Sequence, residues 1–485
     1  MKLNQSGRAT EEILEELRGM RSLDPDYKDG KLWSLVYYLG EDYTSFLNEA
    51  YHLFFSANGL NPGAFKSLKQ LEKKIISIVA GILHGDDQVC GVVTSGGTES
   101  CLLAVKTYRD FARAEKGIRK PEMVVPDTAH VAWLKGAEYF GIKLHRVPAL
   151  PGGGADVQAM KRKVNRNTIM LLGSAPEYPH GMIDPIAELG ELAEKKSIPL
   201  HVDACVGGFL LPFMEKLGHD IPEFDFRIPG VTSISADIHK YGFAAKGASS
   251  ILYRHQKHFN HQVFVFENWP GGIFASPALL GTRPGGAYAA AYAALEAQGE
   301  QGYMELARKA MQATDALKKG IQKMGLQIIA DPKTTLFAFR SEDPAVDMFA
   351  VADLMEKKGW YIDRLQKPDA LHAMVTPEHL NVVDGYLEDL QESVEHAKAH
   401  PELSKSGQAA TYGMLAHAPF RKMVRNEVRK MFASTYCISG KDLDLEQNDL
   451  SVSDSDAGQT KKSGLKEKLI QWIVDRQRRK EMQSR

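Results

Sequence analysis

The stretch VTSISADIHKYGFAAKGASSILYR, residues 231–254, contains two β-rich runs separated by a turn that contains glycine. The runs are VTSISA and SSILYR, and Lys240 lies between them. The upstream run PLHVDA, residues 199–204, carries Asp203 close to its end. Short apolar runs of this kind, bounded by polar and glycine residues, are typical of buried strands in an α/β sheet.

The same pattern recurs between longer helical stretches from about residue 88 to residue 260. Further strand candidates are VCGVVT (89–94), EMVVP (122–126), KLHRVPA (143–149) and TIMLLGSA (168–175). Strands that alternate with helices indicate a mostly parallel sheet with helices packed against it. Because ligands bind beyond the carboxyl ends of the strands in such sheets, the polar residues that follow these runs predict one ligand crevice.

We expect four parts along the chain. They are an N-terminal helical segment (1–87), a large α/β domain (88–324), a small α+β domain (325–415) and a C-terminal extension (416–485). Residues 442–456 of the extension are acidic without a basic residue, which predicts a solvated linker. An apolar stripe flanked by basic residues follows it, and a helix of this kind can lie on a membrane surface or dock on the protein. We favour docking or disorder, because one short helix gives weak membrane affinity.

The composition excludes several classes of partner. With 60 Lys and Arg against 61 Asp and Glu, the formal net charge is -1, so no global field favours nucleic acid. The four cysteines form neither a CxxC pair nor a disulfide framework, which indicates reduced thiols, and we expect no metal site. No signal peptide and no apolar run of membrane-spanning length is recognisable. We expect a soluble, cytoplasmic protein, although delivery into a host cell needs no signal that this sequence would reveal.

Lys240 and Asp203 together suggest a cofactor. A lysine amine can hold the aldehyde of pyridoxal phosphate as a Schiff base, and a carboxylate on the pyridine nitrogen keeps the ring electron-withdrawing. The turn TSGGTES (94–100) follows one strand and opens a helix, so it can offer backbone N–H groups to a phosphate. The small residues after Asp203, including Gly207 and Gly208, suggest that something bulky lies against the backbone there.

Each of these residues also has an ordinary interpretation. Asp203 could cap a helix, Lys240 could be a solvated surface lysine, and His130 could be a satisfied core histidine. A glycine and serine turn before a helix is common without any ligand. In this chain the glycine and serine turn, His130, Asp203 and Lys240 each follow a predicted strand, in that order along the sequence.

That order resembles the fold-type I pyridoxal phosphate enzymes of the group II decarboxylase-like branch. Within the branch, the chain is similar to the sphingosine-1-phosphate lyases over roughly residues 30 to 415. The motifs that carry the similarity include CGVVTSGGTES, TAHVAWLKGAEYFGIKLHRVP, IPLHVDACVGGF and GGIFASPALLGTRPGGA. The resemblance implies a large pyridoxal phosphate domain with a small α+β domain, and a homodimer whose active sites lie at the subunit interface.

The resemblance also implies a role for each matching residue. Lys240 would carry the cofactor, Asp203 would contact the pyridine nitrogen and His130 would stack on the ring. The cofactor phosphate would be held by Gly97, Thr98 and His239, and by Thr282 from the neighbouring subunit. The substrate phosphate would be met by Lys246, Tyr37, Asn58 and Asn61, and Tyr178 would lie at the reacting centre. In SANGLNP, Asn61 stands where the family usually has histidine, and a neutral amide gives no charge-assisted contact.

The implied reaction cleaves the C2–C3 bond of a phosphorylated long-chain base to an aldehyde and phosphoethanolamine. It needs a base for the C3 hydroxyl proton and an acid for the carbon left behind. The candidates are Tyr178, Lys240, His130 and the substrate phosphate with Lys246 nearby, and we favour Tyr178 or Lys240. Two alternatives remain: an amino-acid decarboxylase with the same cofactor residues, and a catalytically silent scaffold. The chain lacks the N-terminal membrane segment of eukaryotic relatives, so the resemblance implies a soluble, bacterial version.

Overall fold

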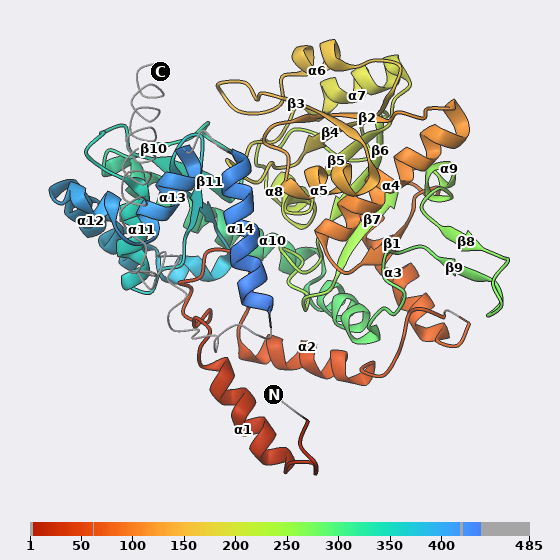
Figure 1. Ribbon diagram of the computed structural model, residues 1–485, viewed down its shortest axis with the longest axis horizontal. Helices are drawn as coiled ribbons and strands as arrows, with labels where there is room; N and C mark the ends of the chain where they lie inside the picture. The colour runs from red at the N-terminus through yellow and green to blue at the C-terminus, as the bar shows by residue number, and fades with distance from the viewer. Residues whose placement is uncertain (1–2, 62, 418–420, 438–485) are drawn as a thin grey trace, which may run out of the picture. The chain divides into compact units, whose positions relative to one another are not determined.

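The computed structural model describes residues 3–61, 63–417 and 421–437 (Figure 1). The described chain divides into two compact units. The first holds the residues up to Lys319 together with Ile328–Ala338 and Ala373–Val383, and the second holds Gly320–Gln327, Phe339–His372 and the residues from Asp384 onward. The predicted acidic linker and the basic amphipathic helix lie outside the described residues, and the four expected domain boundaries stay predictions.

A seven-stranded sheet forms the centre of the first unit (Figure 1). Its strands are β1 (Cys90–Thr94), β2 (Glu122–Pro126), β3 (Lys143–Val147), β4 (Thr168–Ser174), β5 (Leu200–Asp203), β6 (Val231–Ala236) and β7 (Ser249–Tyr253). The spatial order is β1-β7-β6-β5-β4-β2-β3. Only β7 runs antiparallel to its neighbours in this sheet, so the predicted mostly parallel sheet is confirmed.

Side chains from both faces of this sheet are buried, which explains why its strands are apolar almost throughout. Val92 belongs to one buried cluster and the next residue, Val93, belongs to another. The cluster of Val92 includes residues of α4 (Gly97–Lys116), α5 (Val131–Phe140) and α9 (Gln256–Phe259). The cluster of Val93 includes residues of α3 (Lys66–Ile82), α6 (Val157–Lys163), α7 (Ile186–Lys196), α8 (Leu211–Lys216) and α10 (Gly285–Lys323). Helices therefore cover both faces of the sheet, as the alternation predicts.

The glycines after β5 have a structural cause in the packing of the chain. A Cβ atom on Gly207 would lie 2.1 Å from the carbonyl oxygen of Ala175, and one on Gly208 would lie 2.6 Å from the Cβ of Ala236. Both glycines are thus required by close packing against the ends of β4 and β6. The bulk that the sequence suggests against the backbone at these glycines includes the protein chain itself.

Other elements of the first unit lie outside the large sheet. They include α1 (Thr10–Arg21), α2 (Glu41–Leu53) and the hairpin of β8 (Phe264–Phe266) with β9 (Phe274–Ser276). Short 3₁₀ helices span Gly207–Phe209 and Pro377–Asn381. The hairpin and α1 expose large apolar side chains, and α1 buries none of its residues.

The second unit contains most of a four-stranded sheet with the order β10-β11-β13-β12. Its strands are β10 (Gln327–Ile328), β11 (Leu336–Arg340), β12 (Asp363–Leu365) and β13 (Ala370–Met374). The helices are α11 (Met348–Lys357), α12 (Val383–Ala399), α13 (Gly407–His417) and α14 (Arg421–Tyr436), and Pro401–Lys405 is a 3₁₀ helix. This arrangement confirms a small α+β layer with its own sheet.

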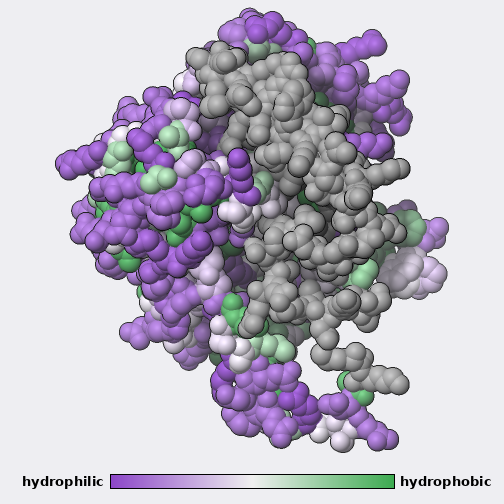
Figure 2. All heavy atoms as spheres, turned by 60° about the vertical axis from the view of Figure 1, so that its left-hand side comes forward, coloured by the Kyte–Doolittle hydropathy of each residue, from purple (hydrophilic) through white to green (hydrophobic). Residues whose placement is uncertain are grey.

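On the face that Figure 2 shows, the coloured side chains are mainly hydrophilic and the hydrophobic ones form small scattered groups. Among the described residues, no helix combines the length and the apolarity that crossing a bilayer requires.

Candidate active site

A cavity of about 490 Å³ lies beyond the carboxyl ends of β1, β4, β5 and β6 in the first unit. Eight of the predicted site residues line it: Gly97, Thr98, His130, Tyr178, Asp203, His239, Lys240 and Lys246. Residues from separate parts of the sequence meet here because each follows the end of a neighbouring strand. A volume of this size suits a small molecule such as a cofactor.

Asp203 is the last residue of β5 and is buried. Its Oδ2 accepts a hydrogen bond of 2.8 Å from the indole Nε1 of Trp133, and its Oδ1 accepts one of 3.1 Å from the backbone N–H of Cys205. Burial by itself would raise the pKa of Asp203, but the bond from Trp133 and the nearby His130 outweigh it, so the pKa is lowered. Asp203 is therefore an ionised carboxylate at the wall of the cavity, as contact with a protonated pyridine nitrogen requires.

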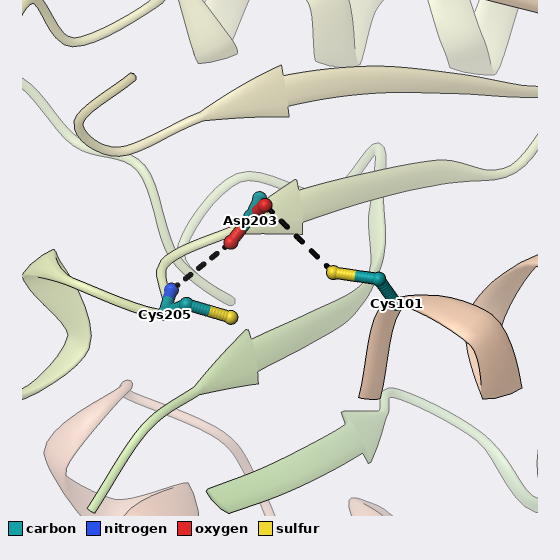
Figure 3. A group of neighbouring side chains, drawn as sticks. All are labelled: Cys101, Asp203 and Cys205. Atoms are coloured by element: carbon teal, nitrogen blue, oxygen red, sulfur yellow. Dashed lines mark hydrogen bonds between the residues drawn. The ribbon is translucent and has the colours of Figure 1, made fainter. Parts of the chain in front are cut away.

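Two thiols flank Asp203 (Figure 3). Cys101 comes from α4 and its Sγ lies 3.9 Å from Oδ2 of Asp203, whereas Cys205 comes from the segment after β5. The two sulfur atoms and a carboxylate oxygen lie within 4.8 Å of one another, and all three residues are buried. Burial raises the pKa of Cys101 to about 11, so this thiol is protonated at neutral pH.

The start of α4 has the geometry of a phosphate cradle. Gly96 precedes the helix, and no side chain caps its first turn. Glu99 is buried and its Oε2 accepts a hydrogen bond of 2.7 Å from the backbone N–H of Ser95. A Cβ atom on Gly97 would lie 2.8 and 2.9 Å from the two carboxylate oxygens of Asp237, so only glycine fits there. This first turn lines the cavity, where its partial positive charge favours an anion.

Lys240 has a close partner that we did not predict from the sequence. Its Nζ lies 2.8 Å from Oδ2 of Asp237, a residue only 2% exposed at the end of β6. Burial by itself would lower the pKa of Lys240, but the charge of Asp237 outweighs it and raises the pKa well above 10.5. The spacing of three residues between the two groups is visible in the sequence, but burial of the pair is not.

His130 and Tyr178 lie next to each other at the cavity. His130 precedes α5, and its Nδ1 accepts a hydrogen bond of 3.2 Å from the backbone N–H of Ala132. The ring centroids of His130 and Tyr178 are 6.1 Å apart and the rings are nearly perpendicular. His130 is exposed and lines the cavity, so it is not a buried core histidine. Its imidazole is accessible to a ring bound in the cavity, which fits a stacking role.

Lys246 lies at the exposed rim of the cavity with Tyr37 beside it. The Lys246 Nζ is 5.0 Å from the centroid of the Tyr37 ring and donates a hydrogen bond of 3.2 Å to the carbonyl of His239. The protein around the amine desolvates it in part, and together with the Lys240 charge this lowers the pKa of Lys246 to about 8. Burial likewise lowers the pKa of His239, whose Nδ1 accepts a hydrogen bond from Ala248.

The remaining predicted residues, Asn58, Asn61 and Thr282, do not line the cavity. The Nδ2 of Asn58 donates a hydrogen bond of 3.3 Å to Oγ1 of Thr282, although 224 residues separate them. The Oδ1 of Asn61 accepts hydrogen bonds from the backbone N–H groups of Gly63 and Ala64. The structure thus brings Asn58 and Thr282 together, but away from the cavity of their own chain.

Comparisons with known proteins identify the family of this chain. Residues 33–342 match the family model of the pyridoxal-dependent decarboxylase conserved domain. The chain is 45% identical over 423 residues to a sphingosine-1-phosphate lyase of Oryza sativa subsp. japonica, which covers 85% of this chain and 78% of that protein. A solved sphingosine-1-phosphate lyase of Burkholderia pseudomallei matches with a TM-score of 0.81 and 37% identity, over 89% of this chain and 97% of that chain. The chain belongs to the sphingosine-1-phosphate lyase family.

A more distant match shows the fold alone. The glutamate decarboxylase of Lactobacillus brevis matches with a TM-score of 0.72 and 21% identity, over 82% of this chain and 95% of that chain. The family model and the matching sphingosine-1-phosphate lyases confirm the predicted family, fold and cofactor. Pyridoxal phosphate also fits the cavity chemically, since an ionised buried carboxylate, a lysine amine and an uncapped helix start all line one cavity.

Proposed function

We propose that this chain cleaves the C2–C3 bond of phosphorylated sphingoid long-chain bases and releases a long-chain aldehyde and phosphoethanolamine. The observation that carries the proposal is one cavity that joins Lys240 and Asp203 to Lys246, in a chain of the sphingosine-1-phosphate lyase family. The first two residues serve the cofactor, and the third offers a cation for the substrate phosphate.

Bound pyridoxal phosphate would supply an electron sink for the pair of electrons that the breaking C2–C3 bond leaves on C2. Lys240 would hold its aldehyde, Asp203 would contact its pyridine nitrogen and His130 would stack on its ring. The buried hydrogen bond from Trp133 supports the role of Asp203, because it keeps the carboxylate both ionised and oriented.

The cofactor phosphate would lie at the start of α4. Gly97 and Thr98 would offer backbone and hydroxyl donors there, and His239 would contribute its ring. The absence of a side-chain cap on this helix supports the assignment. Thr282 would complete the phosphate site from the neighbouring subunit, which fits its position outside the cavity of its own chain.

The substrate phosphate would be met at the cavity rim. Lys246 would provide the positive charge, and the ring of Tyr37 holds the Lys246 amine in place through its contact at 5.0 Å. Asn58 and Asn61 would act on the substrate phosphate from their own loop. The side-chain Oδ1 of Asn61 accepts two backbone hydrogen bonds, so the side-chain N–H₂ group is the part of the amide that can donate to an anion.

Proton transfer needs a base at the C3 hydroxyl. Tyr178 and Lys240 both line the cavity, and Tyr178 comes from the loop after β4. We assign the hydroxyl proton to one of these two residues. We assign His130 to positioning of the cofactor ring and not to proton transfer, because its Nδ1 already accepts a backbone hydrogen bond.

A homodimer with shared active sites is part of the proposal. The β8–β9 hairpin exposes Val265 by 55%, Trp269 by 53% and Ile273 by 78%. Exposed large apolar side chains on one hairpin are typical of a protein–protein contact, and a second copy of the chain would cover them. Thr282 follows the end of the hairpin by six residues, so a partner seated on the hairpin would lie close to it in the sequence.

The competing function is an amino-acid decarboxylase of the same fold. The test is to incubate the purified protein and pyridoxal phosphate separately with a phosphorylated sphingoid base and with a set of α-amino acids. Long-chain aldehyde from the first, without carbon dioxide from the second, is the expected result. Carbon dioxide from an amino acid, without aldehyde from the long-chain base, would overturn the proposal in favour of a decarboxylase.

A further inference from the structure

Asp237 carries an inference that the family resemblance did not supply. The residue follows β6 directly, three positions before Lys240, and lines the same cavity. Its Oδ2 is 2.8 Å from the Lys240 Nζ, whereas the next nearest cation, the ring Nε2 of His239, is 3.9 Å away. The Lys240 amine is therefore the close positive partner of this carboxylate among the described residues.

The second oxygen of the Asp237 carboxylate, Oδ1, is buried and lacks a hydrogen-bond partner among the described residues. Both oxygens face the Cα of Gly97, where a Cβ atom would come within 2.9 Å of each of them. A buried carboxylate with one free oxygen is costly unless a cation stays beside it. The pair is thus more stable as an ammonium and a carboxylate than with either charge alone.

We propose that Asp237 is the counterion that positions the free Lys240 amine and keeps it in the ammonium form. This inference rests on the proposed lyase function, in which the substrate amine releases Lys240 from the cofactor. The released amine then carries a proton and cannot accept the one from the C3 hydroxyl. Of the two candidate bases, Tyr178 is left as the acceptor, and Lys240 holds the proton that C2 needs after the bond has broken.

Proton balance is kept in this scheme. Tyr178, acting as the phenolate, takes the proton of the C3 hydroxyl, and the Lys240 ammonium gives one proton to C2. Transfer of a proton from the Tyr178 phenol to the neutral Lys240 amine then restores the phenolate and the ammonium. No oxidant or reductant is consumed. Asp237 itself is a positioning residue that acts through Lys240.

The protonation state of Lys240 can be measured without substrate. The other titratable groups around it are Cys205, Tyr37, His239 and Lys246, and the measurement must separate their effects from that of Asp237. Apoenzyme is labelled with trace acetic anhydride across a pH series, and mass spectrometry quantifies the label on Lys240 and on Lys246 in the same sample. Lys246 serves as the internal reference, because it lies in the same cavity and donates to the carbonyl of His239, and the Asp237 charge acts on it less than on Lys240.

The wild-type apoenzyme should label Lys240 at a higher pH than Lys246. In Asp237→Asn the Lys240 profile should move to lower pH by at least one unit, which gives about tenfold faster labelling at a fixed pH below the midpoint. Asp237→Glu, which keeps the charge, should restore most of the wild-type profile. In Asp237→Asn the Lys246 profile should move less than the Lys240 profile, because the Asp237 charge is the smallest of the influences on Lys246.

Two results would overturn the inference. One is a wild-type Lys240 that labels at or below the pH of Lys246, which needs no variant at all. The other is an Asp237→Asn profile that coincides with that of the wild type while the variant remains folded by circular dichroism. Because the labelling uses neither cofactor nor substrate, both results are independent of whether the chain proves to be a lyase.

Discussion

The indole N–H of Trp133 donates a hydrogen bond of 2.8 Å to Asp203, the carboxylate that faces the cofactor cavity from the end of β5. Trp133 lies on α5, the helix between β2 and β3 in the sequence, and is fully buried. The bond joins the helix that begins after His130 to the residue proposed to hold the pyridine nitrogen. Loss of the bond should therefore weaken the binding of the cofactor.

We predict that Trp133→Phe weakens pyridoxal phosphate binding while the fold is retained. A hydrogen bond to a buried charged group is worth about 1.5 kcal/mol or more, which corresponds to roughly a tenfold rise in the dissociation constant. Fluorescence titration of the apoenzyme measures it. Trp360→Phe is the matched control, since its N–H donates to Asp389 and it does not line the cavity; equal loss in both variants would speak against the assignment.

We expect Lys240→Ala to abolish turnover and the covalent attachment of the cofactor. Borohydride reduction followed by mass spectrometry should find the cofactor on the peptide of Lys240 in the wild type and on no peptide of the variant. Lys318→Ala is a suitable control, because its amine contacts Pro332 rather than the cavity. Full activity in purified Lys240→Ala protein would show that the lysine is dispensable.

Lys246 gives a prediction with a pH dependence. Its pKa is lowered to about 8, so its amine is an ammonium below that pH and becomes neutral above it. The KM for a phosphorylated long-chain base should consequently rise as the pH increases through about 8. Lys246→Arg should remove this rise because a guanidinium stays charged, and Lys246→Ala should raise the KM more than it weakens cofactor binding. A KM that does not change in Lys246→Ala would contradict the substrate-phosphate role.

The proposed shared site predicts complementation between two inactive variants. Thr282→Asp should repel the cofactor phosphate of the partner, and Lys240→Ala lacks the cofactor lysine. In mixed dimers, one site receives Lys240 from one subunit and Thr282 from the other, so refolding the two variants together should restore about a quarter of the activity, as two-fold symmetry requires. If the mixture stays inactive although light scattering shows dimers, Thr282 does not act across the interface.

Much of the fold could be predicted because the pattern is local. The seven strands of the large sheet lie where apolar β-rich runs predict them. Consecutive residues such as Val92 and Val93 are both apolar because helices cover both faces of the sheet. The three-residue strand Asp363–Leu365 and the β8–β9 hairpin were missed, because runs this short carry no periodicity. The antiparallel direction of β7 depends on the turn that carries Lys240 rather than on the composition of the strand.

The candidate site could be predicted only in part, for a related reason. Lys240, Asp203 and His130 follow strands, so their meeting at one edge of the sheet is a consequence of topology. The buried ion pair of Asp237 with Lys240, and the hydrogen bond between Asn58 and Thr282, depend on three-dimensional packing that no local pattern encodes. The family resemblance supplied the role of Thr282, and it did not supply that of Asp237.

In the proposed reaction, Lys240, Asp203 and Lys246 form one cofactor-and-phosphate site for carbon–carbon cleavage. The most direct measurement is the product balance when the purified protein, loaded with pyridoxal phosphate, turns over a phosphorylated sphingoid base. Long-chain aldehyde and phosphoethanolamine should form in equal amounts, and both should be absent with Lys240→Ala. Consumption of the base without phosphoethanolamine, or no consumption by fully loaded protein, would contradict it.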